Sequence, residues 1–510
     1  MLFRAARKQY LDGSIPTGFQ RTTIVGVNGW IPYKDRRIRI VQLGLEEDAC
    51  REVSDVGHRR TYLTDRLGMP LIETVTGPDM TTPHEVADVA QICRRLVRST
   101  GRVRTGIGAA REDVNVSVRG GTRVEIKGVP RIPRIPLLTH NEAMRQWNLL
   151  RLREELGRRG ITPETFKAET EEVARILQRT SYQPLRNAID AGLAVSAVVL
   201  RGYGGLFNWE TQPCTYFSRE VSDRVRVVAC LTTLPNIAHS DSPSESLSSA
   251  EWESLRKALK ATRDDTIVVV WGNREDAKTG AQEIAIRARE AAVGIPSETR
   301  QALPDGTNGF ERILPGPNRM YPDTDLPPKT VTEERLEKLR RALPVPVWTR
   351  EAFYRDLRVP DDVARPLAMS RLAGLYDVLV RDWKIDPTLA AVALVQFPKR
   401  LRRKGVDPAA LTEDKLIKIF GLYKDGRIPR DGIYLAMSGE LTIDPPPAAL
   451  SGAEVDAAVG RAAGRLASLV VHNPGKRSHV LTGLVMSELR GRADGAAIAD
   501  KIRASLEEKA

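Results

Sequence analysis

The chain has 510 residues, of which 41% are hydrophobic and 28% charged, a composition typical of globular proteins and a length sufficient for two to four domains. No apolar run approaches the roughly 18 residues that a membrane-spanning helix needs, and the N-terminus lacks the apolar core of a signal peptide. The formal net charge of +13 favours a polyanionic partner such as nucleic acid, and we expect a cytoplasmic protein without membrane insertion.

The four cysteines exclude two common kinds of site. Cys50, Cys93, Cys214 and Cys230 include no pair at CxxC spacing, so neither a zinc ribbon nor a redox pair is indicated. Cys214 and Cys230 have the potential to meet across a sheet, but a reducing cytoplasm favours buried free thiols.

Residues 1–130 are predicted to be mostly β. The β-rich runs 22–33 and 36–48 flank a charged turn, which indicates a hairpin. Residues 84–101 have apolar side chains at helical spacing and end in a glycine, so a helix is expected there. Two further strands, 113–119 and 122–128, are separated by a Gly-Gly pair suited to a tight turn.

Acidic and basic side chains occur at alternating positions on these strands. Glu46 and Glu47 are adjacent, so they point to opposite faces of their strand, whereas Glu125 and Lys127 share one face. A carboxylate from each of two neighbouring strands can bind a hard cation such as Mg²⁺. The alternative, which spacing alone favours, is a network of ion pairs and hydrogen bonds on a solvated sheet face.

The strand 113–119 adds an oxygen-rich row to this set. Asp113, Asn115 and Ser117 alternate and therefore lie on one face. Such a row can shape a polar pocket or join the same solvated network.

The rest of the chain divides into an α+β region and a helical region. Residues 141–180 have a helical, highly charged pattern. Residues 193–300 alternate between strands, predicted in 194–207, 223–241 and 266–273, and helices, predicted in 251–263 and 276–294. They are therefore interpreted as a self-contained α+β insertion. Residues 304–328 are rich in turn formers and are predicted to hold no regular element. Residues 331–510 are predicted to be helical, with Pro445–Pro447 as a linker.

The order of motifs along the chain resembles the B/E family of tRNA-dependent amidotransferase subunits. The matching segments, in chain order, are ARKQYLDGSIPTGFQ (6–20), LEEDA (45–49), LTDRLGMPLIE (63–73), GPDM (77–80), DVNVSV (113–118), VEIKG (124–128), PDGT (304–307), NRMYPDTDLPP (318–328) and GRADGAAIADKIRASL (491–506). The insertion and the form MYPDTDLPP are similar to the E type of this family. Gly44 departs from the B type, in which a histidine is common at that place.

The resemblance implies an α+β multidomain fold with four parts. These are a mainly β catalytic cradle (1–192, continued in 301–335), an inserted α+β domain like that of bacterial-type aspartyl-tRNA synthetases (193–300), an all-α helical domain (336–445) and a helical tRNA-binding tail (446–510).

The resemblance also implies a two-step reaction. ATP phosphorylates the glutamate side chain of misacylated Glu-tRNA(Gln), and ammonia then displaces phosphate to give Gln-tRNA(Gln). The implied cofactors are ATP and Mg²⁺, and the implied partners are a D-type glutaminase/asparaginase protein, in a heterotetramer, and the charged tRNA. The sequence contains no P-loop, dinucleotide-binding or GxSxG hydrolase motif that would indicate another chemistry.

The residues that the resemblance assigns to this chemistry fall into three groups. Glu47 and Glu125 are the candidate metal ligands. Candidates for phosphate or carboxylate contact and for shaping the pocket or channel are Arg7, Lys8, Arg66, Lys127, Glu46, Asp113, Asn115 and Ser117. Candidates for tRNA contact are Lys399, Arg400, Arg402, Arg403, Lys404, Arg490 and Arg492; the first five also fit a solvated basic loop.

The resemblance further implies an opening strand with a Glu-x-His motif, which would lie before Met1. Its residues would supply further Mg²⁺ ligands, so we expect weak or no kinase activity from a chain that lacks them. A mis-assigned start codon is the favoured explanation, and a split gene is another. The alternative function is a truncated, catalytically impaired paralogue that binds tRNA.

Overall fold

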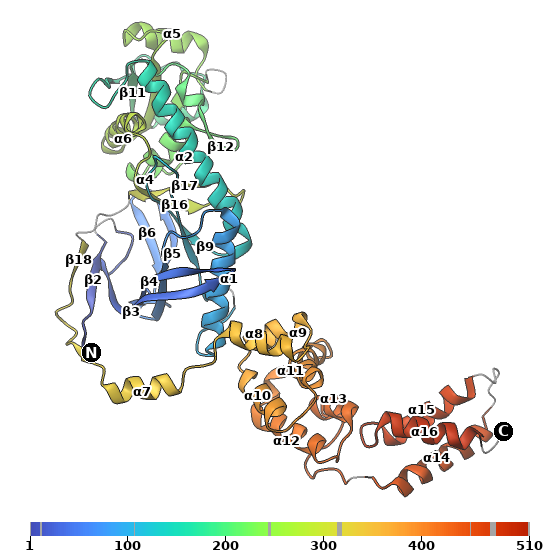
Figure 1. Ribbon diagram of the computed structural model, residues 1–510. Coiled ribbons are helices and arrows are strands. Elements are labelled where there is room, and N and C mark those ends of the chain that lie inside the picture. Colours follow the sequence, from blue (N-terminus) through green and yellow to red (C-terminus); the bar gives the residue numbers. More distant parts are fainter. Residues whose placement is uncertain are drawn as a thin grey trace. The chain divides into compact units, whose positions relative to one another are not determined.

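The computed structural model describes residues 2–10, 13–106, 108–242, 246–313, 319–448, 450–469 and 476–507 (Figure 1). The chain forms two compact units, one made of residues 1–93 and 106–341 and the other of residues 94–105 and 342–510. The predicted α+β, multidomain character is confirmed. Residues 314–318 and 470–475, which belong to the predicted turn-rich segment and tail, lie outside the described residues.

A five-stranded sheet in the order β18-β2-β3-β4-β7 forms the first layer of unit 1. Its strands are β2 (Ala6–Gln9), β3 (Phe19–Tyr33), β4 (Arg36–Glu47), β7 (Pro70–Thr76) and β18 (Met320–Pro322). The predicted hairpin is confirmed, because β3 and β4 pair antiparallel with Tyr33 opposite Arg36. Ile31 and Ile38 are buried at the far end of this sheet. The Tyr33 hydroxyl donates a hydrogen bond of 2.8 Å to Asp88 of helix α1 (Pro83–Ser99), which confirms the predicted helix at 84–101.

A four-stranded sheet in the order β17-β16-β9-β8 forms the second layer. Its strands are β8 (Glu112–Val116), β9 (Val124–Val129), β16 (Glu298–Ala302) and β17 (Asn308–Ile313). The hairpin of β8 and β9 is confirmed, and Gly120 has the positive φ of 80° that the turn requires. The prediction that residues 304–328 hold no regular element is wrong, because β17 pairs along β16 and β18 pairs with β2.

The pairing of β16 with β9 is parallel, so the chain between them forms a crossover connection. This crossover begins with helix α2 (Ile135–Arg158), whose Ile135 and Leu138 pack on the buried side of the second sheet. It then forms a third sheet, in the order β10-β11-β15-β14, with helices on its faces (Figure 1). The elements of this region are β10 (Ala168–Glu172), α3 (Gln183–Asp190), β11 (Ala194–Leu200), β12 (Glu210–Gln212), β13 (Thr215–Tyr216), α4 (Phe217–Val228), β14 (Ile237–His239), α5 (Ser249–Ala258), β15 (Thr266–Gly272) and α6 (Arg274–Val293).

Two expectations for this region are corrected. The helical pattern predicted for 141–180 stops at Arg158, and β10 follows and pairs with β11, so the third sheet begins before the predicted boundary at residue 193. The first part of the strand predicted in 223–241, up to Val228, is helix α4, because Phe217, Val221 and Val225 repeat every four residues and are buried on one helix face. Only Ile237–His239 of that segment form a strand, β14. The strands β11 and β15 and the helices α5 and α6 are confirmed.

A buried ionic cluster connects α2, α4, α6 and β16. Arg145 of α2 donates hydrogen bonds to Glu142 at 2.9 Å, to Glu220 of α4 at 3.0 Å and to Glu298 of β16 at 2.9 Å. Arg300 of β16 bonds to the same Glu220 at 3.0 Å. These side chains are almost inaccessible to solvent, so the cluster fixes the third sheet and its helices to the second sheet.

Unit 2 is helical, as predicted, and has two hydrophobic cores. The first joins α8 to α13 and the second joins α14 to α16, with Pro445–Pro447 between them. The helices are α8 (Val347–Asp356), α9 (Asp361–Ala368), α10 (Ala373–Arg381), α11 (Pro387–Arg403), α12 (Glu413–Lys424), α13 (Arg430–Ser438), α14 (Gly452–Ala467), α15 (Arg477–Leu489) and α16 (Gly495–Glu507). Among the described helices, none combines the length and apolar character needed to cross a bilayer.

The remaining strands and the remaining α-helix belong to unit 1. They are β1 (Leu2–Phe3), β5 (Arg51–Val56), β6 (Arg59–Leu63), β19 (Lys329–Thr330) and α7 (Glu333–Arg341). The β5–β6 hairpin lies between β4 and β7 in the chain, and His58 at its tip contacts Asp276 of α6 at 3.0 Å.

Candidate active site

One face of the first sheet carries a cation between carboxylates. Lys8 of β2 forms an ion pair with Glu46 of β4, and its Nζ lies 3.8 Å from an Oε of Glu73 on β7. The hydroxyl of Thr22 donates to Glu46 at 3.0 Å. Although burial opposes its charge, Glu46 raises the pKa of Lys8, so this lysine is held in its charged form.

The opposite face of the same sheet carries a second ionic cluster. Arg7 of β2 and Arg21 of β3 each donate from Nε to the buried carboxylate of Asp323, at 2.7 Å. Arg21 also pairs with Glu47 at 3.4 Å, and both arginines pair with Asp325. Glu46 and Glu47 therefore lie on opposite faces, as alternation along a strand predicts.

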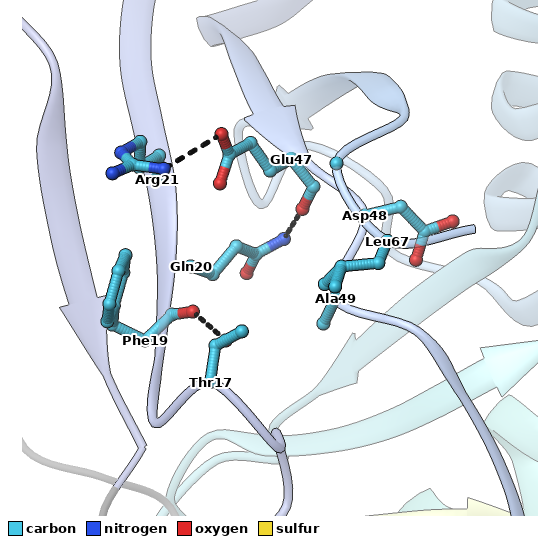
Figure 2. Close-up of a pocket in the computed structure, with 9 residues that line it drawn as sticks. Thr17, Phe19, Gln20, Arg21, Glu47, Asp48, Ala49 and Leu67 are labelled. Atoms are coloured by element: carbon cyan, nitrogen blue, oxygen red, sulfur yellow. Dashed lines mark hydrogen bonds and ion pairs between the residues drawn. The ribbon is translucent and has the colours of Figure 1, made fainter. Parts of the chain in front are cut away.

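A small pocket of about 200 Å³ opens at the end of β4, lined by Thr17, Phe19, Gln20, Arg21, Glu47, Asp48, Ala49, Leu67 and Gly68. Figure 2 shows Arg21 pointing toward Glu47, while the amide of Gln20 donates to the main-chain oxygen of Glu47 at 2.6 Å. Arg66 donates from Nε to Asp48, one of the lining residues, at 2.7 Å. Arg66 thus orients the loop after β4 in this structure.

The second sheet presents the predicted polar face. Val114 and Ile126 are buried on one side, whereas Asp113, Asn115 and Glu125 point to the other. Asn115 lies directly opposite Glu125, and the main-chain N–H of Gly128 donates to Asp113 at 2.7 Å. Ser117 follows the last residue of β8 and is exposed.

This polar face continues onto strands that are distant in the sequence. Thr299 of β16 is the cross-strand neighbour of Glu125, and Arg312 of β17 is the neighbour of Thr299. Gln301 lies beside Lys127 in the same way. Burial and the nearby Arg312 both lower the pKa of Lys127. The row thus brings two cations together beside a carboxylate.

The polar faces of the two sheets act on each other electrostatically. The pKa of Glu73 is raised, first by burial, then by Glu46, and further by Asp113 and Glu125 of the second sheet. The pKa of Glu125 is raised by burial and by Asp113. Half-buried carboxylates that repel one another in this way are a favourable environment for a divalent cation, which would relieve the repulsion.

The predicted metal pair is only partly brought together. Glu125 faces the side of the first sheet that carries Glu46 and Glu73, whereas Glu47 is on the other side with Arg21. Within the described ranges, no three His, Cys, Asp or Glu side chains are already arranged as a metal site. A metal ion here would therefore need further ligands, such as water or substrate phosphate, as Mg²⁺ commonly has.

Several residues of this arrangement were missed by reasoning from the sequence. Glu73 stands inside the motif LTDRLGMPLIE, and its signal is the pairing of β7 with β4, which places it with Gly44 and Glu46. Thr299 and Arg312 carry no local signal, because only the parallel pairing of β16 with β9 places them beside Glu125. Asp323 lies inside MYPDTDLPP, and its partners are found on β2 and β3.

The candidate tRNA-contacting residues are on the surface of unit 2. Arg400 and Lys404 lie over the ring of Tyr434, at 4.6 and 5.5 Å from its centroid, so they also pack against the helical core. Lys399, Arg402 and Arg403 are exposed around the end of α11, and Arg490 and Arg492 are exposed in the turn between α15 and α16.

Comparison with known proteins gives a consistent result. Residues 2–337 match the family described as the GatB/GatE catalytic domain. The chain is 33% identical to the E-type subunit of glutamyl-tRNA(Gln) amidotransferase from Methanocaldococcus jannaschii over 98% of its own length and 81% of the relative. It is 35% identical to the corresponding protein of Archaeoglobus fulgidus, covering 98% of the chain and 80% of the relative. With the Pyrococcus furiosus protein of the same name, identity is 37% over 83% of the chain and 67% of the relative.

Proposed function

Because this chain belongs to the GatB/GatE family and resembles its E-type members along nearly its whole length, we propose that it amidates glutamate attached to tRNA(Gln). In the proposed reaction, ATP activates the glutamate side chain as an acyl phosphate, and ammonia from a D-type glutaminase/asparaginase partner displaces the phosphate. The match to E-type relatives over 98% of the chain supports the family and the reaction class.

The observation that supports this chemistry best is the gathering of both carboxylates and cations on the polar faces of the two sheets. Carboxylates gather at Glu73, Glu125 and Asp113, whereas cations gather at Lys127 and Arg312. Phosphoryl transfer requires both kinds of group, because carboxylates bind Mg²⁺ and cations stabilise the phosphate oxygens. A merely solvated sheet face would not need half-buried charges with shifted pKa values.

We assign Glu125 and Glu73 as the protein ligands of Mg²⁺, in place of the pair Glu47 and Glu125 expected from the sequence. The residues fit the ion because their mutual repulsion would be relieved by two positive charges. Mg²⁺ often takes one or two carboxylates and completes its shell with water and phosphate oxygens, so two protein ligands are sufficient. Bound Mg²⁺ would supply charge neutralisation for the phosphates.

The activation step follows from elementary chemistry. An oxygen of the substrate carboxylate forms a bond to the γ-phosphorus, and the bond from that phosphorus to the bridging oxygen of ADP breaks. Phosphate is then a far better leaving group than oxide when ammonia attacks the carbonyl carbon. Lys8 keeps its charge beside Glu46, so we assign it to orient the substrate carboxylate.

The opposite face of the first sheet has a structural part in this proposal. Arg7 and Arg21 both form ion pairs with Asp323, which follows β18 in the chain. These ion pairs hold β18 beside β2, the strand that carries Lys8. Arg66 likewise forms an ion pair with Asp48. These arginines therefore shape the site, and Lys8 and Lys127 remain the cations assigned to the substrates.

The test uses the full chain reconstituted with the D-type partner and supplied with Glu-tRNA(Gln), ATP and Mg²⁺. Glu125→Gln and Glu73→Gln should each lower acyl-phosphate formation by at least about 100-fold. Binding of tRNA should stay within about twofold, because the cations proposed to contact tRNA are in unit 2. Glu52→Gln, in the exposed β5 strand, is the matched control and should keep full activity. Wild-type protein that binds tRNA but forms no amide would instead support the impaired, tRNA-binding alternative. Full activity in both glutamine variants would refute the metal assignment.

A further inference from the structure

We propose that Arg312 is a phosphate-binding residue of this site and contacts the β- and γ-phosphates of ATP. The inference rests on the proposed function and extends it to a residue that lies outside the β8–β9 hairpin and has no motif of its own. It is carried by the position of Arg312 on the polar face, by the side chains that hold it there, and by a buried hydroxyl beside it.

The strand register places Arg312 on the face that carries Glu125. Paired residues of neighbouring strands point to the same side of a sheet, and Glu125, Thr299 and Arg312 are successive cross-strand partners. A β-bulge in the pairing of β16 with β17 interrupts the alternation between Phe310 and Arg312, so that Phe310 is paired with Arg300 and Arg312 with Thr299. On the opposite side of the same strands, Ile126 and Phe310 are almost completely buried. Arg312 therefore points into the space between the two sheets rather than into the core.

Contacts with Ser14 and Tyr10 hold the guanidinium of Arg312 in place. Its Nη1 donates to the hydroxyl of Ser14 at 3.0 Å, and its Cζ lies 5.4 Å from the ring centroid of Tyr10. The hydroxyl of Tyr10 donates to Gln20 at 3.3 Å, and Gln20 donates to Glu46 at 3.4 Å. Arg312 is thus connected to the first sheet and its Lys8–Glu46 pair, so its orientation is fixed before substrate binds.

Arg312 adds positive charge where one cation already stands. Lys127 of β9 lies on the same polar face, two residues beyond Glu125 and beside Gln301 of β16. Arg319 lies over the same Tyr10 ring at 5.0 Å and adds a third positive charge. The carboxylates of Glu125 and Glu311 lie close to these cations. A triphosphate carries several negative charges and would bind to such a group of cations.

A separate observation concerns Thr299, which lies between Glu125 and Arg312 in the row. Its side chain is fully buried, and its hydroxyl has no hydrogen-bond partner in the part of the chain that the structure describes. Leaving a buried hydroxyl without a partner costs roughly 1 to 3 kcal/mol, so a water molecule or a ligand oxygen is expected there. A bound phosphate, or its water, is suitably polar to fill this position.

Arginine suits this role because its planar fork donates two parallel hydrogen bonds to phosphate oxygens, whereas lysine offers a point charge. In the activation step, negative charge moves onto the bridging oxygen of ADP as its bond to the γ-phosphorus breaks. A fixed guanidinium at the phosphates stabilises that charge without having to reorganise.

The experiment measures ATP binding as well as turnover. The full chain is titrated calorimetrically with ATP in the presence of Mg²⁺, and Arg312→Gln should weaken ATP affinity by about 10- to 100-fold, the range for losing a hydrogen bond to a charged group. Arg312→Lys keeps the charge and should fall between the wild type and Arg312→Gln. Arg119→Gln, which removes an exposed arginine from the turn between β8 and β9, is the control and should leave affinity unchanged.

The outcomes separate this inference from the proposed function. Wild-type protein that does not bind ATP would refute the ATP-dependent reaction itself. Wild-type binding together with unchanged affinity in both Arg312 variants would refute only the role of Arg312. Weaker binding of tRNA with unchanged ATP affinity would also refute it, because Arg312 would then contact an RNA phosphate. If Arg312→Gln fails to fold by circular dichroism, Arg312→Lys alone decides, and ATP affinity equal to that of the wild type would overturn the proposal.

Discussion

Replacing Glu220 by glutamine should destabilise unit 1 more than any exposed charge change. The carboxylate of Glu220 accepts hydrogen bonds from Arg145 at 3.0 Å and from Arg300 at 3.0 and 3.2 Å, and Arg287 lies 3.5 Å away. Although burial opposes its ionisation, Arg145 and Arg300 lower the pKa of Glu220 to about 2. The carboxylate therefore stabilises the folded state at pH values above its ordinary pKa, and this stabilisation is lost only as the pH falls toward 2.

The magnitude follows from the charges left behind. Glutamine keeps the shape but removes the negative charge, so the buried arginines lose a shared counterion. Breaking a buried ion pair in this way costs roughly 3 to 5 kcal/mol. The exposed pair of Arg340 and Glu333 is the control, and Arg340→Gln should cost less than about 1 kcal/mol.

Hydrogen–deuterium exchange with mass spectrometry is the suitable assay, because a chain of two units need not unfold in one step. Peptides of α4 and β16 should exchange about 100-fold faster or more in Glu220→Gln at pH 7, and peptides of α12 should not change. If the free energy of opening of α4 and β16 falls by less than about 1 kcal/mol in Glu220→Gln, the cluster does not stabilise these elements and the reasoning is refuted.

Three further predictions follow from the site and the surface. Glu125→Gln should raise the melting temperature at pH 7, because burial and Asp113 raise the pKa of Glu125 and make its charged form costly. This gain in melting temperature, measured by differential scanning calorimetry, should shrink toward pH 4. An unchanged melting temperature would contradict the pKa shift. Stability near Asp323 should depend on pH in the opposite sense, because Arg7 and Arg21 lower the pKa of Asp323. In the wild type, protection of β2 from hydrogen exchange should persist above about pH 4 and be lost at lower pH. Asp323→Asn should lack this protection already at pH 7. Replacing Lys399, Arg402 and Arg403 together by glutamine should weaken tRNA binding and reduce the slope of log affinity against log salt by about 2 to 3, whereas Arg365→Gln in the same unit should not; an unchanged slope would exclude the end of α11 from the tRNA interface.

The parts of the fold that depend on neighbouring residues were predictable from the sequence. The β3–β4 and β8–β9 hairpins follow from alternation and a turn, and α1 follows from its apolar spacing. Helix α4 was mistaken for a strand because its valines suit either element in a short window. The buried Glu220 and Arg224, spaced four apart on that helix, belong to an ionic cluster whose other members come from α2, α6 and β16.

The candidate site was predictable only within single strands. Glu46 and Glu47 were correctly expected on opposite faces, and Asp113, Asn115 and Glu125 do share one face. The sequence of the strand does not predict whether Glu46 or Glu47 faces Glu125, because this depends on how the first sheet packs against the second. Thr299 and Arg312 enter through a parallel pairing that no local pattern records.

That parallel pairing has a consequence for synthesis on the ribosome. Glu125 is made early, yet Thr299 and Arg312 emerge only after α2, the third sheet and α6 have been translated. The third sheet can fold meanwhile, and the cluster around Glu220 then sets the direction in which β16 leaves it. The proposed nucleotide site is thus complete only after β17 has joined the second sheet, and a nascent chain stalled before that point would lack Arg312.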